Sequence, residues 1–306
     1  MIVVAGEALI DLKPVESRNG FLLSPHPGGS PYNVALSLGR LGAPVAFLGR
    51  FSTDFFGQLL RAHLQKSRVD LSYTAQGPEL TTLAVVTPGA QGESFSFYAH
   101  RTADTLLNPK DLPHTLPDGA PLHFGSISLV LEPTASTLET LMRREAGRRL
   151  ISLDPNVRPF LIQNKEAYKA RLRSWLSQSN LVKVSQADLD WLYPGLSIEQ
   201  IAREWLELGP EWVVVTLGSA GAAAFSRTCE ARVEAPQITV VDTVGAGDAF
   251  MAGLLAGLNH SGFTSSTKLA SLDLEQIAGL LSFATKVATL TCTRAGADPP
   301  WQEEVI

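Results

Sequence analysis

Residues 240–250 read VVDTVGAGDAF, a short apolar run that leads through a glycine-rich turn into the start of a helical pattern. Gly245 and Gly247 lack a Cβ, so the bare N–H groups of the helix start can approach an anion closely. Asp248 lies in the first turn, where a carboxylate can take a proton from a hydroxyl while the amides stabilise charge on a transferred group. The alternative interpretation is a plain helix start whose acids stabilise the helix dipole.

Two other glycine loops are excluded because residues that they need are missing. A dinucleotide loop has a third glycine where this chain has Phe250, and no acid follows about twenty residues later to hold a ribose. A P-loop needs a Gly-Lys pair, and the sequence contains none. HExxH and GxSxG motifs are also absent, and the six histidines are not spaced as ligand pairs. The turn at 242–248 is therefore the main candidate for chemistry.

The composition is that of a soluble globular enzyme: of 306 residues, 45% are hydrophobic and 18% are charged. The net charge of −5, with no lysine or arginine block, argues against a nucleic-acid partner. Cys229 and Cys292 form no cluster, which argues against a disulfide scaffold. Glu7 and Asp11 interrupt the apolar start of the chain, and no apolar run reaches membrane-spanning length. We expect a cytoplasmic protein without a membrane partner.

Short apolar runs alternate with amphipathic segments along the chain. The runs that read as buried strands are IVVAG (2–6), VAFLGRF (45–51), LISLDP (150–155), LVKVS (181–185) and WVVVTLG (212–218). Helical patterns occupy 33–42, 54–66, 165–178, 197–208, 246–259 and 273–290. Strands that are apolar on both sides and alternate with helices indicate an α/β fold, with a layered, mostly parallel sheet flanked by helices.

Two segments break this alternation. TTLAVVTPG (81–89) and ESFSFYAH (93–100) face each other across AQG, and Phe95 and Phe97 alternate with polar residues. This pattern predicts a hairpin with one solvated face. With residues 12–24 it could form a small sheet that serves as a lid or an oligomer contact. A surface hairpin at the sheet edge is the alternative.

The segment DTVGAGD (242–248) resembles the C-terminal signature of the ribokinase-like (pfkB) family of carbohydrate kinases. PGGSPYNVALSLGRLG (27–42) resembles the N-terminal signature of the same family. The two occur in the family's order, about two hundred residues apart, and the resemblance covers essentially the whole chain. It implies a single ribokinase-like α/β domain over residues 1–306, with a small β-sheet lid from about 12–24 and 80–104.

The resemblance implies an ATP- and Mg²⁺-dependent sugar kinase, which transfers the γ-phosphate of ATP in line to a sugar hydroxyl. Asp248 matches the family's catalytic base, and Gly245, Ala246 and Gly247 match its anion hole. Asp242 matches a position that in many members lies near a monovalent cation, so K⁺ is a further expected cofactor.

The same resemblance names the residues of the sugar site. They are Asp11, Gly28, Gly29, Asn33 and, on the lid strand, Tyr98 and Arg101. A carboxylate and an amide provide the directional partners that a polyol needs, and glycines allow close approach. Asp11 could instead be a solvated acid at a strand end, and the two lid residues could equally be solvated.

The nucleotide and metal residues come from three further segments. DPNVRPFL (154–161), VKVSQADL (182–189) and VTLGSAGA (215–222) contribute Asn156, Arg158, Lys183, Thr216, Gly218 and Gly221. The family usually has Asn-x-x-Glu within the second segment, to steer Mg²⁺ and its waters. This chain has Ser185 and Asp188 at those positions, so Asp188 is the candidate for an indirect Mg²⁺ role.

Fructose is the expected acceptor, because GEALIDL, FYAHRTAD and DPNVRPFL together resemble the fructokinase-like branch. The alternatives are a 2-keto-3-deoxygluconate kinase, a ribokinase or a riboside kinase, and, from another class, a non-catalytic sugar-binding relative. A sugar phosphate is disfavoured because no arginine or lysine cluster could hold a second phosphate. Phe95 and Phe97 would either cover this chain's own sugar or pair with a partner lid in a homodimer.

Overall fold

The computed structural model describes residues 1–17, 20–89 and 92–305, and its larger sheet has nine strands. Their order is β13-β12-β11-β10-β9-β8-β1-β4-β5. The bounds are β1 (Ile2–Ala5), β4 (Val45–Ser52), β5 (Asp70–Gly77), β8 (Leu122–Gly125), β9 (Ile151–Asp154), β10 (Leu181–Ser185), β11 (Trp212–Thr216), β12 (Ala222–Phe225) and β13 (Glu230–Val233). The strands from β5 to β11 pair in parallel, and β12 and β13 add an antiparallel edge.

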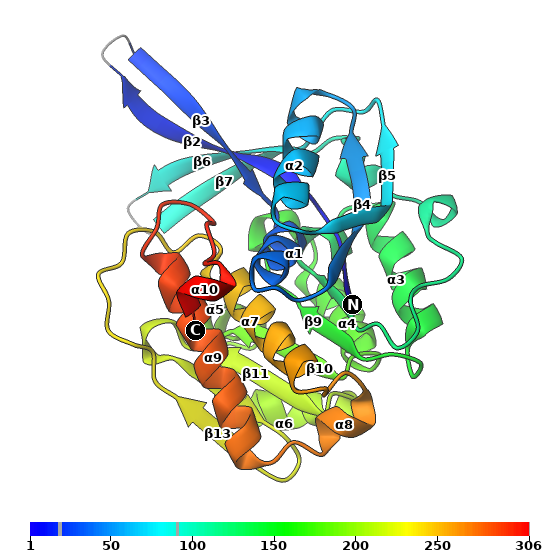
Figure 1. Cartoon of the computed structure of the whole chain (residues 1–306), viewed down its shortest axis with the longest axis vertical. Coiled ribbons are helices and arrows are strands. Elements are labelled where there is room, and N and C mark those ends of the chain that lie inside the picture. Colours follow the sequence, from blue (N-terminus) through cyan, green and yellow to red (C-terminus); the bar gives the residue numbers. More distant parts are fainter. Residues whose placement is uncertain (18–19, 90–91, 306) are drawn as a thin grey trace.

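Helices cover both faces of this sheet (Figure 1). One layer contains α1 (Ser30–Arg40), α2 (Phe55–Lys66), α7 (Ala246–His260), α8 (Ser266–Ala270) and α9 (Leu274–Cys292), and the other contains α3 (Thr134–Glu145), α4 (Lys165–Leu176), α5 (Gln186–Leu192) and α6 (Ile198–Leu208). Strand β1 shows why: Ile2 and Val4 belong to the core beneath the first layer, while Val3 and Ala5 belong to the core beneath the second. Strands buried on both faces are those of a parallel α/β sheet.

Short elements complete the chain. They are α10 (Gln302–Val305) and the 3₁₀ helices η1 (Ala103–Leu106), η2 (Pro109–Asp111), η3 (Ser126–Leu129), η4 (Pro159–Leu161) and η5 (Gly218–Ala220). The longer predicted helices end within two residues of the observed bounds, as in α4 and α9. None of the described helices is long and apolar enough to span a membrane. The predicted layered α/β class is confirmed.

A second sheet projects from the body at the upper left of Figure 1. It has the order β3-β2-β6-β7, formed by β2 (Leu9–Ser17), β3 (Gly20–Gly28), β6 (Leu83–Gly89) and β7 (Gly92–Tyr98). β6 and β7 pair antiparallel, as their alternating sequence predicts, and β2 pairs in parallel with β6. Residues 18–19, within the predicted 12–24 segment, residues 90–91, within the predicted AQG turn, and the Phe95 side chain lie outside the described part.

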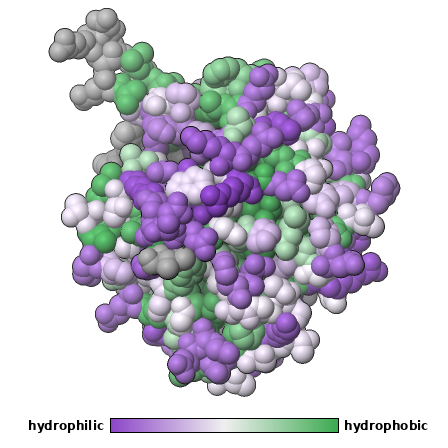
Figure 2. Space-filling view, viewed as in Figure 1, coloured by the Kyte–Doolittle hydropathy of each residue, from purple (hydrophilic) through white to green (hydrophobic). Residues whose placement is uncertain are grey.

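The projecting sheet exposes several apolar side chains, which Figure 2 shows in green at the upper left. Val15, Leu22 and Leu23 are 44%, 56% and 36% exposed. Near its base the sheet packs on the body, where the Phe97 ring stacks on Phe160 with centroids 5.5 Å apart. The sheet therefore has an apolar free part and an anchored base beside the ends of α1 and α7.

Candidate active site

Two cavities adjoin where the ends of α1 and α7 meet. The smaller one, of about 300 Å³, is called the acidic cavity after Glu7, Asp11 and Asp248 in its wall. The larger one, of about 700 Å³, is called the glycine-lined cavity after Gly218, Gly221 and Gly247. Both cavities have Asn156, Thr243 and Gly247 in their linings. A molecule in each would therefore meet at these three residues, next to Asp248.

Asp248 is buried in the first turn of α7 and is held by two side chains of α1. The Ser30 hydroxyl donates to its Oδ1 at 2.6 Å and the Asn33 amide donates to its Oδ2 at 2.9 Å. Burial raises the pKa of Asp248 to about 6, against these hydrogen bonds and the charge of Lys183. The carboxylate is thus ionised at neutral pH yet basic enough to accept a proton, which suits a general base.

The turn before Asp248 depends on its glycines. Gly245 caps α7 with φ 77°, a left-handed conformation, and a Cβ there would meet Ala297. A Cβ on Gly247 would lie 2.9 Å from the Lys183 ammonium. Ala246 lines the glycine-lined cavity with Gly247. These residues begin a 15-residue helix beside both cavities, and the Ala246 N–H donates to the Thr243 carbonyl at 3.2 Å. An anion hole of the expected kind would therefore use mainly the N–H groups of Gly245 and Gly247.

The predicted sugar residues of β2, β3 and α1 lie in or beside the wall of the acidic cavity. Asp11 lines it, and a Cβ on Gly28 would collide with the Asp11 carboxylate. Gly29 has φ 107° at the start of α1, where a Cβ would lie 2.9 Å from the Glu7 carbonyl oxygen. Asn33 lines the cavity and holds Asp248, and its own Oδ1 is buried without a hydrogen-bond partner in the described structure.

Sequence reasoning missed Glu7 as a site residue. Its side chain is 1% exposed, lines the acidic cavity and accepts the backbone N–H groups of Ser30 at 3.1 Å and Ser128 at 3.2 Å. Burial raises the pKa of Glu7 to about 7, against those hydrogen bonds. An acid between two apolar runs was the signal that could have found it. Glu7 orders the N-terminal end of α1, which in turn orients Asp248.

Two predicted lid contacts lie away from the cavity in this structure. Tyr98 is 64% exposed at the end of β7, and Arg101 is exposed with φ 54°. Neither lines the acidic cavity, to which β7 contributes Phe97 instead. Their role in sugar binding stays a prediction.

Asn156 and Arg158 lie at the junction of the cavities. Asn156 lines both cavities and has φ 40°, an unusual backbone conformation for a residue other than glycine. The Arg158 guanidinium donates to the Asn156 Oδ1 at 2.7 Å and lines the acidic cavity. Both residues therefore face the place where the two substrates would meet.

Lys183 is fixed by a buried ion pair at the floor of the glycine-lined cavity. Its ammonium lies 2.8 Å from Asp154, and the two side chains are 5% and 1% exposed. Burial disfavours the charged lysine, but Asp154 and the nearby Asp248 outweigh it, so the pKa of Lys183 is raised. The sequence named Lys183 but not Asp154. The pair keeps a positive charge beside Gly247.

Ser185 and Asp188 begin α5 at the wall of the same cavity. The Ser185 hydroxyl accepts the Asp188 N–H at 3.0 Å, which is a helix N-cap. The Asp188 Oδ1 accepts the Val157 N–H at 3.2 Å, and burial with the charge of Asp154 raises the pKa of Asp188. Thr216, Gly218 and Gly221 line this cavity too, with φ 60° and 96° at the two glycines.

The donor set is compatible with Mg²⁺ that is carried mainly by a nucleotide. Within residues 1–17, 20–89 and 92–305, no group of three or more His, Cys, Asp or Glu side chains could hold a metal ion. Mg²⁺ usually keeps several waters and binds through one or two carboxylates plus substrate phosphates. Asp188 fits as the carboxylate of such a site, through water.

Asp242 is paired with a lysine from the projecting sheet. The Lys13 ammonium lies 2.8 Å from its Oδ2, which also accepts the Gly296 N–H at 2.8 Å, and Oδ1 accepts the Val244 N–H at 3.0 Å. Burial alone would raise the pKa of Asp242, but these three donors hold it below its ordinary value. The ammonium and the two N–H groups occupy the carboxylate oxygens and offer no oxygen ligand of their own. This arrangement does not fit a bound K⁺, because K⁺ needs oxygen ligands.

Known proteins give an independent comparison. The sequence model of the family described as "pfkB family carbohydrate kinase" matches residues 1–304 of this chain. A fructokinase of Rhizobium leguminosarum bv. trifolii is 40% identical over 276 residues, which cover 89% of this chain and 84% of that protein.

Solved structures agree in fold over nearly the whole chain. Fructokinase with bound ATP from Xylella fastidiosa superposes with a TM-score of 0.91 at 29% identity, covering 99% of this chain and 96% of that one. A fructokinase double mutant from Vibrio cholerae O395, with fructose, ADP and a potassium ion bound, gives a TM-score of 0.83 at 28% identity, covering 97% and 93%. These proteins carry the same architecture from end to end.

Proposed function

The chain belongs to the pfkB family of carbohydrate kinases, and we propose that it transfers the γ-phosphate of ATP to a hydroxyl of fructose. One observation carries the proposal: the acidic cavity and the glycine-lined cavity share Gly247, directly before a buried Asp248. A hydroxyl in one cavity and a terminal phosphate in the other would both reach the amides of the turn.

The acidic cavity supports an unphosphorylated sugar. Its carboxylates and the Asn33 amide offer the directional hydrogen bonds that a polyol uses. Among the described residues in its wall, Arg158 is the one cation, and Asn156 already accepts hydrogen bonds from it. A second phosphate would lack a partner there, so fructose is favoured over a fructose phosphate. The fructokinases among the relatives support the same acceptor.

The glycine-lined cavity supports ATP. Ile238 and Val240 line it and are 37% and 56% exposed, which leaves a flat apolar surface for a purine base. At its other end Lys183 and the turn at 245–247 provide the positive charge and N–H groups that phosphates need. The base and the phosphates of one nucleotide would thus find matched partners at opposite ends.

The proposed reaction is a direct in-line transfer. A sugar hydroxyl oxygen forms a bond to the γ-phosphorus while the bond to the β-phosphate oxygen breaks, and ADP leaves. The hydroxyl proton passes to Asp248, which Ser30 and Asn33 orient. The amides of Gly245, Ala246 and Gly247 stabilise the charge on the transferred group. Asp188 would hold Mg²⁺ through water, and the ion would neutralise negative charge on the phosphates.

The second sheet is proposed to be a lid over the sugar. Its strands β2 and β7 place Leu9, Asp11 and Phe97 in the wall of the acidic cavity. Closure over the sugar would exclude water and suppress ATP hydrolysis. The exposed Leu22 and Leu23 support a homodimer through the lids, and the free thiols of both cysteines support a cytoplasmic location.

A coupled assay of ADP release tests the acceptor. ATP and Mg²⁺ are supplied with fructose, ribose, 2-keto-3-deoxygluconate, glucose, adenosine or aminoimidazole riboside. We expect the highest kcat/KM with fructose. A higher kcat/KM with another acceptor would overturn the fructose assignment. If the folded protein turns over none of them, while thermal shifts show that it binds ATP or sugar, the non-catalytic relative is the correct interpretation.

A further inference from the structure

Three nitrogen donors hold the carboxylate of Asp242. Lys13 and the Gly296 N–H share its Oδ2, and the Val244 N–H binds its Oδ1. Lys13 and Asp242 are both only 18% exposed in their side chains. A K⁺ ion at this carboxylate would have to displace an ammonium that already neutralises it.

We infer that the Lys13 ammonium takes the place of the monovalent cation beside the anion hole, so that catalysis by this chain needs no K⁺. The inference rests on the proposed kinase activity and concerns its electrostatics. Asp242 begins the turn that leads to Gly245 and Gly247. A fixed positive charge at Asp242 keeps that carboxylate from repelling the phosphate in the anion hole.

Lys13 reaches this position because of the strand on which it lies. Asp11 and Lys13 are two residues apart on β2, so their side chains leave the strand on the same face. Asp11 faces the acidic cavity while Lys13 reaches Asp242 across 229 residues of sequence. Strand β2 therefore carries both the Asp11 carboxylate of the proposed sugar site and the Lys13 ammonium that neutralises Asp242 in the glycine-rich turn.

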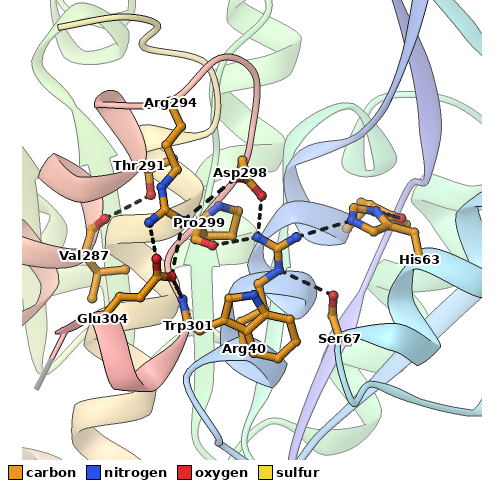
Figure 3. Close-up of polar contacts among 11 residues, drawn as sticks. Arg40, His63, Ser67, Val287, Thr291, Arg294, Asp298, Pro299, Trp301 and Glu304 are labelled. Atoms are coloured by element: carbon orange, nitrogen blue, oxygen red, sulfur yellow. Dashed lines mark hydrogen bonds and ion pairs between the residues drawn. The ribbon is translucent and has the colours of Figure 1, made fainter.

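The other side of Asp242 is held by the C-terminal segment, which Figure 3 shows against α1. The Arg40 guanidinium pairs with Asp298 at 2.5 Å, donates to the Pro299 carbonyl at 2.7 Å and lies over the Trp301 ring, 5.4 Å from its centroid. These contacts fix the loop in which Gly296 donates to Asp242 and Ala297 lies against Gly245. The loop is thus anchored to α1 by contacts within this chain.

The neighbours of Lys13 also favour its role as the cation. His26 lies opposite Asp11 in the β2–β3 pairing, and burial together with the charge of Lys13 lowers the pKa of His26. A neutral imidazole leaves Lys13 as the positive group at Asp242. Removing the ammonium would leave a partly buried carboxylate beside the phosphate site, and a cation from solution could then bind it.

The first test compares wild type with Lys13→Met at constant ionic strength, in K⁺ or in choline as the cation. Wild type should turn over fructose at the same rate, within about twofold, in either salt. Lys13→Met should lose about tenfold or more in choline, the scale of a charge-assisted hydrogen bond, and recover part of it in K⁺. Lys169→Met changes a partly buried lysine of α4 that pairs with Glu166; it is the matched control and should behave as wild type. Stimulation of wild type by K⁺ beyond about fivefold, or a Lys13→Met enzyme that is fully active in choline, overturns the inference.

The second test does not need turnover. Crystals soaked in Rb⁺ should show no anomalous peak at Asp242 in wild type and a peak there in Lys13→Met. If Lys13→Met does not fold, Lys13→Gln replaces it. The wild-type crystal alone can also contradict the inference, by showing a Rb⁺ ion bound to the Asp242 carboxylate. If the protein phosphorylates no sugar, the proposed function is refuted, but the Rb⁺ peak at Asp242 still shows whether a cation binds there.

Discussion

The two cavities differ in the kinds of groups that line them. The acidic cavity presents side chains, with three carboxylates that are each fixed by hydrogen bonds or by close backbone packing. The glycine-lined cavity presents mainly backbone and small or apolar residues, and Lys183 is its buried charge. The first surface suits a ligand recognised by its hydroxyl groups, and the second suits a ligand recognised by phosphates and a flat ring.

This difference has an energetic side. Burial raises the pKa of Glu7 to about 7 and that of Asp248 to about 6, so the acidic cavity keeps its charges at the edge of protonation. On the other side, the charge of Lys183 is secured by Asp154 and its pKa is raised. Proton transfer therefore belongs to one cavity and fixed positive charge to the other, and each can be perturbed separately.

Asp248→Asn should have the largest effect, because it removes the proton acceptor and leaves the glycine-lined cavity intact. We expect kcat to fall on the order of 10²–10⁴-fold, the usual range for a general base. The KM for ATP should stay close to the wild-type value. Steady-state kinetics with fructose and ATP varied in turn measure both.

The fold should tolerate this change. The oxygen of the introduced amide can still accept the Ser30 hydroxyl, and the Asn33 amide can turn so that its unpartnered Oδ1 accepts the new N–H. The melting temperature is the control and should change little. A kcat within tenfold of wild type, in a folded protein, would mean that another group takes the proton.

The sequence predicts this contrast only in part. Asp248 and its glycines follow from one continuous segment, because a helix start and its first turn are local structure. Asp11 and Asn33 follow from resemblance, since nothing local brings β2, α1 and α7 together. Glu7 and Asp154 were missed because an acid in an apolar run is informative only once its covering elements are known.

The ion pair of Lys13 with Asp242 is the clearest example of what the sequence leaves open. The two residues are 229 positions apart, and no periodicity links a lid strand to a glycine turn. Tyr98 and Arg101 illustrate the reverse case, since the strand pattern places them on the lid but does not decide which side chains turn toward the sugar. The alternation of apolar strands with helical segments, by contrast, correctly predicted the α/β layers. A strand that is buried on both faces is apolar along its whole length, so its own sequence indicates its place in the sheet.

The pH dependence sharpens the acidic side of the comparison. Asp248 must be ionised to accept a proton, so kcat/KM for fructose should fall about tenfold per pH unit below pH 6. A pH–rate profile of wild type measures this step. The residual rate of Asp248→Asn should lack it. If the step persists in that variant, Glu7, with its pKa of about 7, is the titrating group instead.

Protonation of Glu7 and Asp248 would not itself unfold the protein. The folded-state pKa values of Glu7 and Asp248 are raised, so the native state binds these protons more tightly than the unfolded state. Their contribution to the free energy of unfolding therefore grows as the pH falls through about 7 to 6 and is lost as the pH rises again. Thermal melts across the same range, read beside the rates, separate the two effects.

Lys183→Met tests the glycine-lined side and should mainly affect ATP. Loss of one charged donor should raise the KM for ATP about tenfold, the lower end for a hydrogen bond to a charged group, with less effect on the KM for fructose. The variant should also be destabilised by about 3–5 kcal/mol, because Asp154 stays buried without its partner.

The double variant Lys183→Met/Asp154→Asn separates these two consequences. The neutral amide introduced at position 154 can still accept the Asn156 N–H that Asp154 accepts at 3.2 Å, so most of the lost stability should return. The weak ATP binding should not return, because the positive charge beside Gly247 is still absent. If the double variant regains wild-type KM for ATP, Lys183 serves only to neutralise Asp154, and the fixed charge for phosphates must come from elsewhere in the cavity. If it regains stability alone, the two cavities divide the work as their linings indicate, with side-chain acids for the sugar and a buried lysine with backbone amides for the nucleotide.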